Sequence, residues 1–189
     1  MAIFTKAIAA SADDGFESSG TMDVTGNVIN INGPSMLGFW RITDVAIPPG
    51  STINSATLAL NFISGSFDDP NVTIYCEDVD DGAGLTATTN DISGRTLTTA
   101  STTWNAGGIG TGIKTSPSFA SSVQEVIDRG GWANENSLDV IFAGNSGSSF
   151  RVSTWDSTNP EAEITIDYTP PASSGATVKA MYYARLRGV

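Results

Sequence analysis

FWRITDVAIPPGSTINSATLALNF, residues 39–62, is the stretch that decides the fold class of this chain. Two runs in which apolar and polar side chains alternate with a period of two, as on β-strands, flank the corner Pro48-Pro49-Gly50. The second run places four apolar residues on one face: Ala56, Leu58, Leu60 and Phe62. The two prolines lack an amide donor and the glycine accepts a positive φ, so the chain must leave the sheet and turn. The stretch predicts a strand, a corner and a second strand.

The same alternation recurs along most of the 189 residues, of which 40% are apolar, enough for one domain with its own core. Further strands are predicted at residues 3–9, 21–31, 72–77, 97–104, 137–143, 150–155 and 161–168. A single helix is predicted over residues 116–130, with Ser116 as its N-cap, and a capping box at Ser122 and Glu125 is the alternative start. About nine short strands with one short helix predict an all-β, antiparallel two-sheet jelly-roll sandwich.

Two segments lack the strand pattern. Residues 11–20 are rich in Ser, Asp and Gly and are predicted to be a loop. Residues 78–112 are rich in Thr and Gly with few large apolar side chains, which predicts a long excursion holding one short strand near its end. Long excursions of this kind are often where function resides.

The charge is unevenly distributed. The net charge of −11 comes from 20 acidic and 9 basic residues, and every acid lies at or before Asp167. An acidic body of this kind repels nucleic acid and anionic membranes, so neither is expected as a partner. The chain has no histidine, which excludes Ser-His-Asp and Cys-His catalysis and the usual zinc sites. The single Cys76 is predicted to be a buried structural thiol.

The end of the chain differs from the body. We divide the chain into a sandwich of residues 1–168, a Pro/Ser/Gly linker of residues 169–177 and an extended basic-aromatic docking tail of residues 178–189, VKAMYYARLRGV. The tail residues predicted to mediate assembly are Lys179, Met181, Tyr182, Tyr183, Arg185, Leu186 and Arg187. A basic aromatic segment complements an acidic surface on a sister subunit, although packing on its own sandwich and disorder stay open.

Four sequence signatures together resemble a known family. They are Phe-Trp-Arg-Ile at residues 39–42, Ile-Pro-Pro-Gly-Ser-Thr-Ile-Asn-Ser-Ala-Thr-Leu-Ala-Leu at 47–60, Ser-Pro-Ser-Phe with Val-Gln-Glu-Val-Ile-Asp-Arg-Gly-Gly-Trp at 116–132, and Pro-Glu-Ala-Glu-Ile-Thr-Ile-Asp-Tyr at 160–168. This pattern resembles the DNRLRE-like jelly-roll modules over residues 13–168. Such modules occur beside bacterial carbohydrate-active domains and in virion proteins of tailed phages. The start lacks a signal-peptide pattern and the tail leads to no catalytic domain, which favours the phage side of the resemblance.

Two sets of acidic residues are candidate calcium sites, because calcium is bound by six to eight oxygen atoms. The first set is Asp78, Asp80 and Asp81, whose spacing does not match an EF-hand; a solvated acidic loop is the alternative. The second set is Asp13, Asp14 and Glu17. Any calcium here would be structural, and no other cofactor is expected.

Among the four tryptophans, Trp104 is the candidate for contacting a glycan, together with its neighbour Asn105, because both lie in the glycine-rich excursion. Trp40, Trp132 and Trp155 are predicted to lie in the core or to cover a sheet. No motif marks a pair of catalytic carboxylates, so an enzyme is not expected.

Two functions follow from these observations. The first is a phage virion structural protein, a capsid decoration or cement subunit located in the virion, with itself and a major capsid or tail protein as partners. Homo-oligomers, often trimers, are what the resemblance implies for such subunits. The alternative is a glycan-binding adhesion module.

Overall fold

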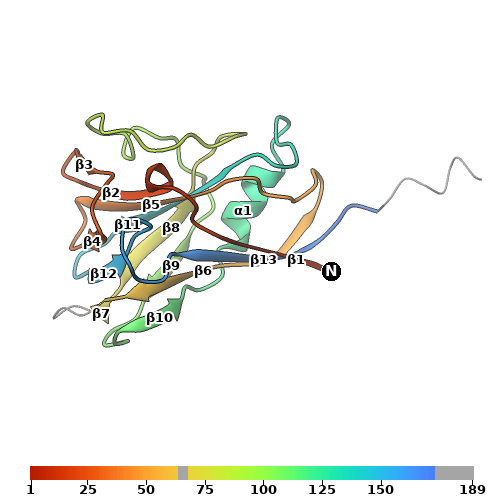
Figure 1. Ribbon diagram of the computed structural model, residues 1–189. Coiled ribbons are helices and arrows are strands. Elements are labelled where there is room, and N and C mark those ends of the chain that lie inside the picture. Colours follow the sequence, from red (N-terminus) through yellow and green to blue (C-terminus); the bar gives the residue numbers. More distant parts are fainter. Residues whose placement is uncertain (64–67, 173–189) are drawn as a thin grey trace, which may run out of the picture.

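The protein is described by a computed structural model, which covers residues 1–63 and 68–172. Two antiparallel sheets pack face to face, with one short helix at the side of the sandwich (Figure 1). Sheet A runs in the order β1 (Ala2–Ala7), β13 (Glu163–Thr169), β6 (Thr52–Phe62), β12 (Ser149–Ser153) and β4 (Val28–Ile31), with β10 (Gly112–Thr115) paired to β6 and β7 (Asp68–Asp69) paired to β12. Sheet B runs in the order β3 (Thr21–Asp23), β2 (Asp14–Ser18), β5 (Met36–Ile42), β11 (Leu138–Gly144), β8 (Asn71–Cys76) and β9 (Thr102–Asn105). The predicted all-β two-sheet sandwich is confirmed.

The two strands on either side of the Pro-Pro-Gly corner are confirmed, and they lie in different sheets. β5 is a central strand of sheet B and β6 is a central strand of sheet A, so the corner carries the chain from one sheet to the other. Gly50 at this corner has φ 75°, which favours glycine.

The core between the sheets is built from the inward side chains of both. Trp40 packs on Phe142 with ring centroids 4.7 Å apart, and Phe62 stacks on Phe150 at 5.3 Å. Such aromatic contacts add to the free energy of area burial. Cys76 is fully buried in this core and burial raises the pKa of its thiol, which confirms its predicted structural role.

The predicted strand over residues 21–31 is wrong, because two strands in different sheets replace it. β3 belongs to sheet B and β4 to sheet A. Between them the Asp23 carboxylate accepts hydrogen bonds from the N–H groups of Thr25 and Gly26, which forms a tight turn at the crossover. The predicted loop over residues 11–20 is also wrong, since it contains β2, which pairs with β5.

The helix α1 (Ala120–Ile127) begins four residues after the predicted N-cap. The Ser116 hydroxyl accepts a hydrogen bond from the Leu58 N–H, and the Ser118 hydroxyl accepts one from the Ala56 N–H. The 116–119 segment therefore extends the edge pairing of β6 instead of starting a helix.

The predicted capping box is also wrong. Ser122 donates a hydrogen bond to the Ala100 carbonyl oxygen, and the Glu125 carboxylate accepts hydrogen bonds from the Thr99 and Ala100 N–H groups. These hydrogen bonds lower the pKa of Glu125. Both side chains fasten the end of the excursion to α1.

The excursion itself lies over the outer face of sheet B, at the top of Figure 1. Two outward side chains of sheet B, Phe39 and Ile141, pack there against Leu85 and Ile92 of the excursion. The short strand expected near its end is present as β9, which is shorter than predicted. Within residues 1–63 and 68–172, the outer face of sheet A has no such cover.

Candidate functional site

Trp104, the predicted glycan contact, is buried. Its side chain is 6% exposed, and its ring meets Phe62 and Phe142 edge-on with centroids 5.8 and 6.3 Å apart. The expectation of a ring facing a ligand is wrong, because Trp104 takes the inward position of the alternating strand β9. Asn105 takes the next, exposed position, and its role stays a prediction.

The exposed tryptophan is Trp155, which was predicted to lie in the core or to cover a sheet. Its side chain is 40% exposed, in the turn that follows β12. Trp40 and Trp132 are buried as predicted, and the Trp132 indole N–H donates to the Ile47 carbonyl oxygen at 3.0 Å.

The acidic loop at residues 78–81 binds other parts of the chain. Arg129 donates to the carboxylates of Asp78 and Asp80, while Asp81 accepts a hydrogen bond from the Ser137 N–H at 2.7 Å. Across residues 1–63 and 68–172, no three His, Cys, Asp or Glu side chains are grouped so as to hold a metal ion. The geometry thus gives the calcium hypothesis no support at this loop.

The second acidic set is divided between the two faces of β2. Asp13 forms an ion pair with Arg41 at 3.2 Å. Glu17 points to the outer face and accepts hydrogen bonds from the N–H groups of Ile92 and Ser93 in the excursion. Asp14 points to the core side, beside the cross-strand position of Trp40. These side chains do not converge on a common point.

Asp14 is a buried carboxylate that joins the two sheets. One of its oxygens accepts a hydrogen bond from the Trp155 N–H at 2.9 Å, and the other has no hydrogen-bond partner in the described part of the chain. Burial raises the pKa of Asp14 to about 7, the Trp155 hydrogen bond opposes that shift, and the Asp156 carboxylate adds to it.

A second buried carboxylate, Asp139, belongs to an ionic cluster under the excursion. The Arg95 guanidinium, 8% exposed, donates to Glu77 at 2.7 Å, to Asp139 at 2.8 Å and to Asp91 at 3.1 Å. It also lies 4.5 Å from the centroid of the Phe39 ring. Burial, followed by the neighbouring Glu77 carboxylate, raises the pKa of Asp139. This cluster fastens the excursion to sheet B.

The rest of the described chain leaves the outer face of sheet A uncovered, and we call it the open face. Strands β1, β13, β6 and β10 form it, on the lower side of the sandwich in Figure 1. Its outward side chains are mostly small: Ile3, Thr5, Ala7, Ser55, Thr57, Ala59, Asn61, Ile113, Thr115, Glu163, Thr165 and Asp167. A row of threonines, Thr5, Thr165 and Thr57, crosses its centre.

Two large apolar side chains stand out from this face. Ile3 on the edge strand β1 is 74% exposed, and Ile113 on the edge strand β10 is 62% exposed. Sequence analysis missed both. Ile3 is followed by Phe4, so one of the two must face outward, but the alternation alone does not show which. Ile113 lies in a strand of four residues with too few positions for a pattern.

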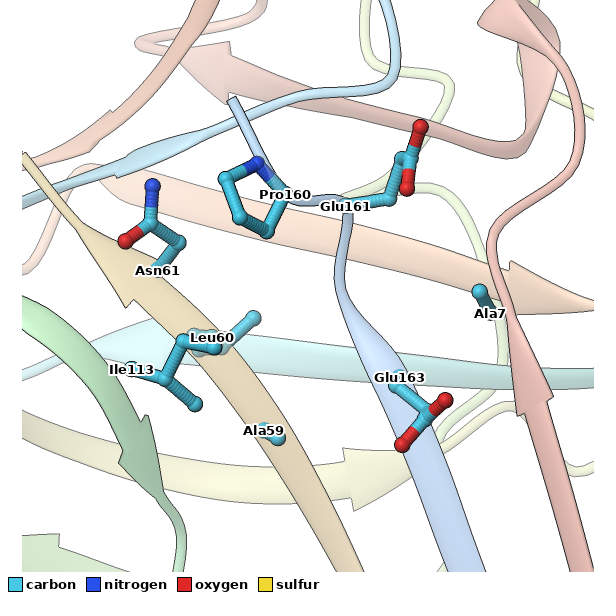
Figure 2. A pocket seen from close by; sticks show the side chains of 8 residues that line it. All are labelled: Ala7, Ala59, Leu60, Asn61, Ile113, Pro160, Glu161 and Glu163. Carbon is cyan, nitrogen blue, oxygen red and sulfur yellow. The ribbon is translucent and has the colours of Figure 1, made fainter.

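One end of the open face is hollowed (Figure 2). β13 pairs with β6 as far as Glu163 and Ala59, and β12 joins β6 only at Phe62. In between, the chain at Pro160 bends away, which leaves a hollow of about 230 Å³. We call this hollow the acidic groove; it is lined by Ala7, Ala59, Leu60, Asn61, Ile113, Pro160, Glu161 and Glu163.

The groove combines an apolar floor with negative charge. Glu161 and Glu163 are both exposed, and within residues 1–63 and 68–172 neither forms an ion pair. In Figure 2, Ile113 lies on one side of the hollow and Glu163 on the other. A second hollow adjoins the groove at the shared Asn61 and is lined further by Phe62, Ile63, Thr111 and Asn159.

Comparison with known proteins adds no identification: no family model matches the chain, and no curated protein matches it. The resemblance to DNRLRE-like modules therefore stays a prediction that the quoted sequence signatures carry. Most of the predicted linker and all of the docking tail, including Lys179, Arg185 and Arg187, lie outside the described residues. No helix in the described ranges is both long and apolar enough to cross a membrane.

Proposed function

We propose that this chain is a structural subunit of a phage virion, a capsid decoration or cement protein that acts by assembly and not by catalysis. The observation that carries the proposal is the open face of sheet A. A face of mostly small side chains, with Ile3 and Ile113 exposed at its two edges, suits close contact with another protein surface.

The contrast between the covered outer face of sheet B and the uncovered outer face of sheet A supports this assignment. The long excursion and the Arg95 cluster seal the outer face of sheet B, so that face has little apolar surface left for a partner. No part of the chain that the structure describes covers the outward side chains of the open face. The partners expected there are a second copy of the chain and the major capsid or tail protein of the particle.

The arrangement of acids supports a role without catalysis. Asp14 is buried between the sheets and Asp139 is buried under the excursion, so they do not face each other across a cleft as the carboxylates of a glycosidase do. The resemblance to virion modules supports the virion as the location, and the acidic body argues against a nucleic-acid partner.

The test is the mass of the full-length protein in solution, measured by light scattering over a range of concentrations. Thr57→Arg places a large charged side chain at the centre of the open face, and we expect it to reduce the wild-type oligomer to monomers. Thr103→Arg is the matched control, because Thr103 is an exposed strand residue on sheet B. If Thr57→Arg and Thr103→Arg both keep the wild-type mass, the open face is not the assembly surface.

Glycan binding is the second candidate, and the exposed ring of Trp155 is the observation that favours it. An exposed indole can stack on a sugar ring, and its backbone N–H is held by Asp14. If the chain binds glycans through Trp155, Trp155→Ala abolishes binding to a glycan array and leaves the fold intact. Binding that survives Trp155→Ala would contradict it.

A further inference from the structure

The acidic groove has two properties that a partner segment must match. Its floor is apolar, with Ala7, Ala59 and the exposed Ile113, and its rim carries Glu161 and Glu163. Four of the body's six cations, Lys6, Arg41, Arg95 and Arg129, already form ion pairs elsewhere in the described chain. A segment that carries both apolar side chains and cations not engaged in other ion pairs would fit this groove.

The chain contains one segment of that composition. Residues 178–189 carry three cations, Lys179, Arg185 and Arg187, and no acid, together with the large apolar or aromatic residues Met181, Tyr182, Tyr183 and Leu186. The hollow of about 230 Å³ has room for one large side chain, and the adjoining hollow at Asn61 has room for another. We propose that the acidic groove of one copy binds residues 178–189 of a second copy. This inference rests on the proposed assembly function and deepens it.

The position where the chain leaves the sandwich favours a second copy over the same copy. The groove lies at the Glu163 end of β13, whereas the chain departs after Thr169 at the other end, about 20 Å away at ~3.3 Å per residue. At that end Pro171 lies beside Gly50, and residues 170–172 lead away from the body (Figure 1). Pro170 and Pro171 each hold φ near about −65°, so an immediate reversal toward the chain's own groove is disfavoured.

The size of the open face gives a second reason for a docking segment. Four strands spaced ~4.8 Å apart and about six residues long present roughly 300–400 Å². A stable interface of standard size buries about 800 Å² on each partner. The open face alone supplies about half of that area, so a stable contact needs further surface, which a docked tail would supply.

The experiment compares charge-reversed full-length chains by light scattering at matched concentration. The groove variant is Glu161→Lys with Glu163→Lys, and the tail variant is Lys179→Glu with Arg185→Glu and Arg187→Glu. We expect each variant alone to associate at least about 10-fold more weakly than the wild type, because each places like charges in contact. We expect an equimolar mixture to recover association, because the reversed tail then meets the reversed groove. Glu135→Lys, at an exposed glutamate outside the open face, is the control and is expected to keep the wild-type mass.

The mixture keeps the test valid even if one variant folds poorly, since recovered association requires both variants to be folded. Wild-type association by the groove variant would overturn the inference, as would a mixture that stays monomeric while both variants keep the wild-type circular dichroism spectrum. If the groove variant keeps the wild-type mass and Thr57→Arg loses it, the assembly face stands and only the tail inference fails. If Thr57→Arg also keeps the wild-type mass, the proposed function fails with it.

Discussion

The outer faces of the two sheets differ in their residues and in whether another segment of the described chain covers them. Sheet B turns large apolar side chains outward, such as Phe39 and Ile141, and a long excursion covers them. Sheet A turns outward mainly Thr, Ser and Ala, with Thr57 at the centre, and needs no cover to stay in water. A face with large outward side chains is part of the core, whereas a face with small ones is available to a partner.

The largest expected change in the free energy of unfolding comes from removing the Arg95 cluster that holds the excursion on sheet B. Arg95→Met leaves the buried Asp139 and the partly buried Glu77 without their cation. Loss of one member of a buried ion pair costs about 3–5 kcal/mol of unfolding free energy. Chemical denaturation measures the change. The matched control is Arg151→Met at an exposed arginine of sheet A, which should stay within about 0.5 kcal/mol of wild type. Equal effects of the two substitutions would contradict the contrast between the faces.

The junction between the two sheets is tested by Asp14→Asn, which keeps the hydrogen-bond acceptor for the Trp155 N–H and removes the charge. The pKa of Asp14 is raised in the folded protein, so the folded state keeps its proton where the unfolded chain has lost it. The contribution of Asp14 to stability is therefore lost as pH rises from about 4 to about 7.

Asp14→Asn should accordingly stabilise the protein by about 2–4 kcal/mol at about pH 8 and leave it nearly unchanged at about pH 4. Thermal unfolding at the two pH values measures this difference. A gain of the same size at both pH values would show that packing, and not ionisation, is responsible.

The edge of sheet A is tested by Ser116→Ala. The hydroxyl of Ser116 is the acceptor for the buried Leu58 N–H, and alanine leaves that donor without a partner. An unsatisfied buried donor costs about 1–3 kcal/mol. Urea denaturation gives the value, and Ser121→Ala on the exposed side of α1 serves as the control, with a change below about 0.5 kcal/mol.

The smallest effect on stability is expected on the open face itself. Ile113→Ser removes an exposed apolar side chain, so the unfolding free energy should change by less than about 0.5 kcal/mol. Self-association measured by sedimentation should weaken, because the exposed isoleucine contributes to the contact. A large loss of stability with unchanged association would mean that Ile113 belongs to the fold and not to the interface.

The sequence predicts the sandwich well where one face of a strand is apolar and the other polar. The run from Ala56 to Phe62 is an example, and the structure confirms its inward face. β2 was not predicted because two of its buried positions are the acids Asp14 and Glu17, which break the apolar pattern of a strand. Both carboxylates can be buried because backbone N–H groups of other segments donate hydrogen bonds to them. The helix start was wrong because a serine can accept a bond from a neighbouring strand as well as cap a helix, and only the tertiary structure decides which.

The candidate site was less predictable for a related reason. Composition placed Trp104 in a glycine-rich excursion, but its exposure depends on which face of β9 it takes. The acidic groove arises where β13 stops and β12 begins to pair with β6, and no local pattern encodes the distance between those two points. The charge difference between body and tail was visible in the sequence, and the surface that could receive the tail was not.

The most direct test of the account is whether the open face is occupied in the assembled protein. Cys76 is fully buried with a raised thiol pKa, so a cysteine introduced on the surface is labelled selectively. The rate of thiol labelling is measured for full-length Thr57→Cys and Thr103→Cys at increasing protein concentration. The account predicts that Thr57→Cys becomes protected as the protein assembles, while Thr103→Cys is labelled at a constant rate. Labelling of Thr57→Cys that does not slow as oligomers form would contradict it.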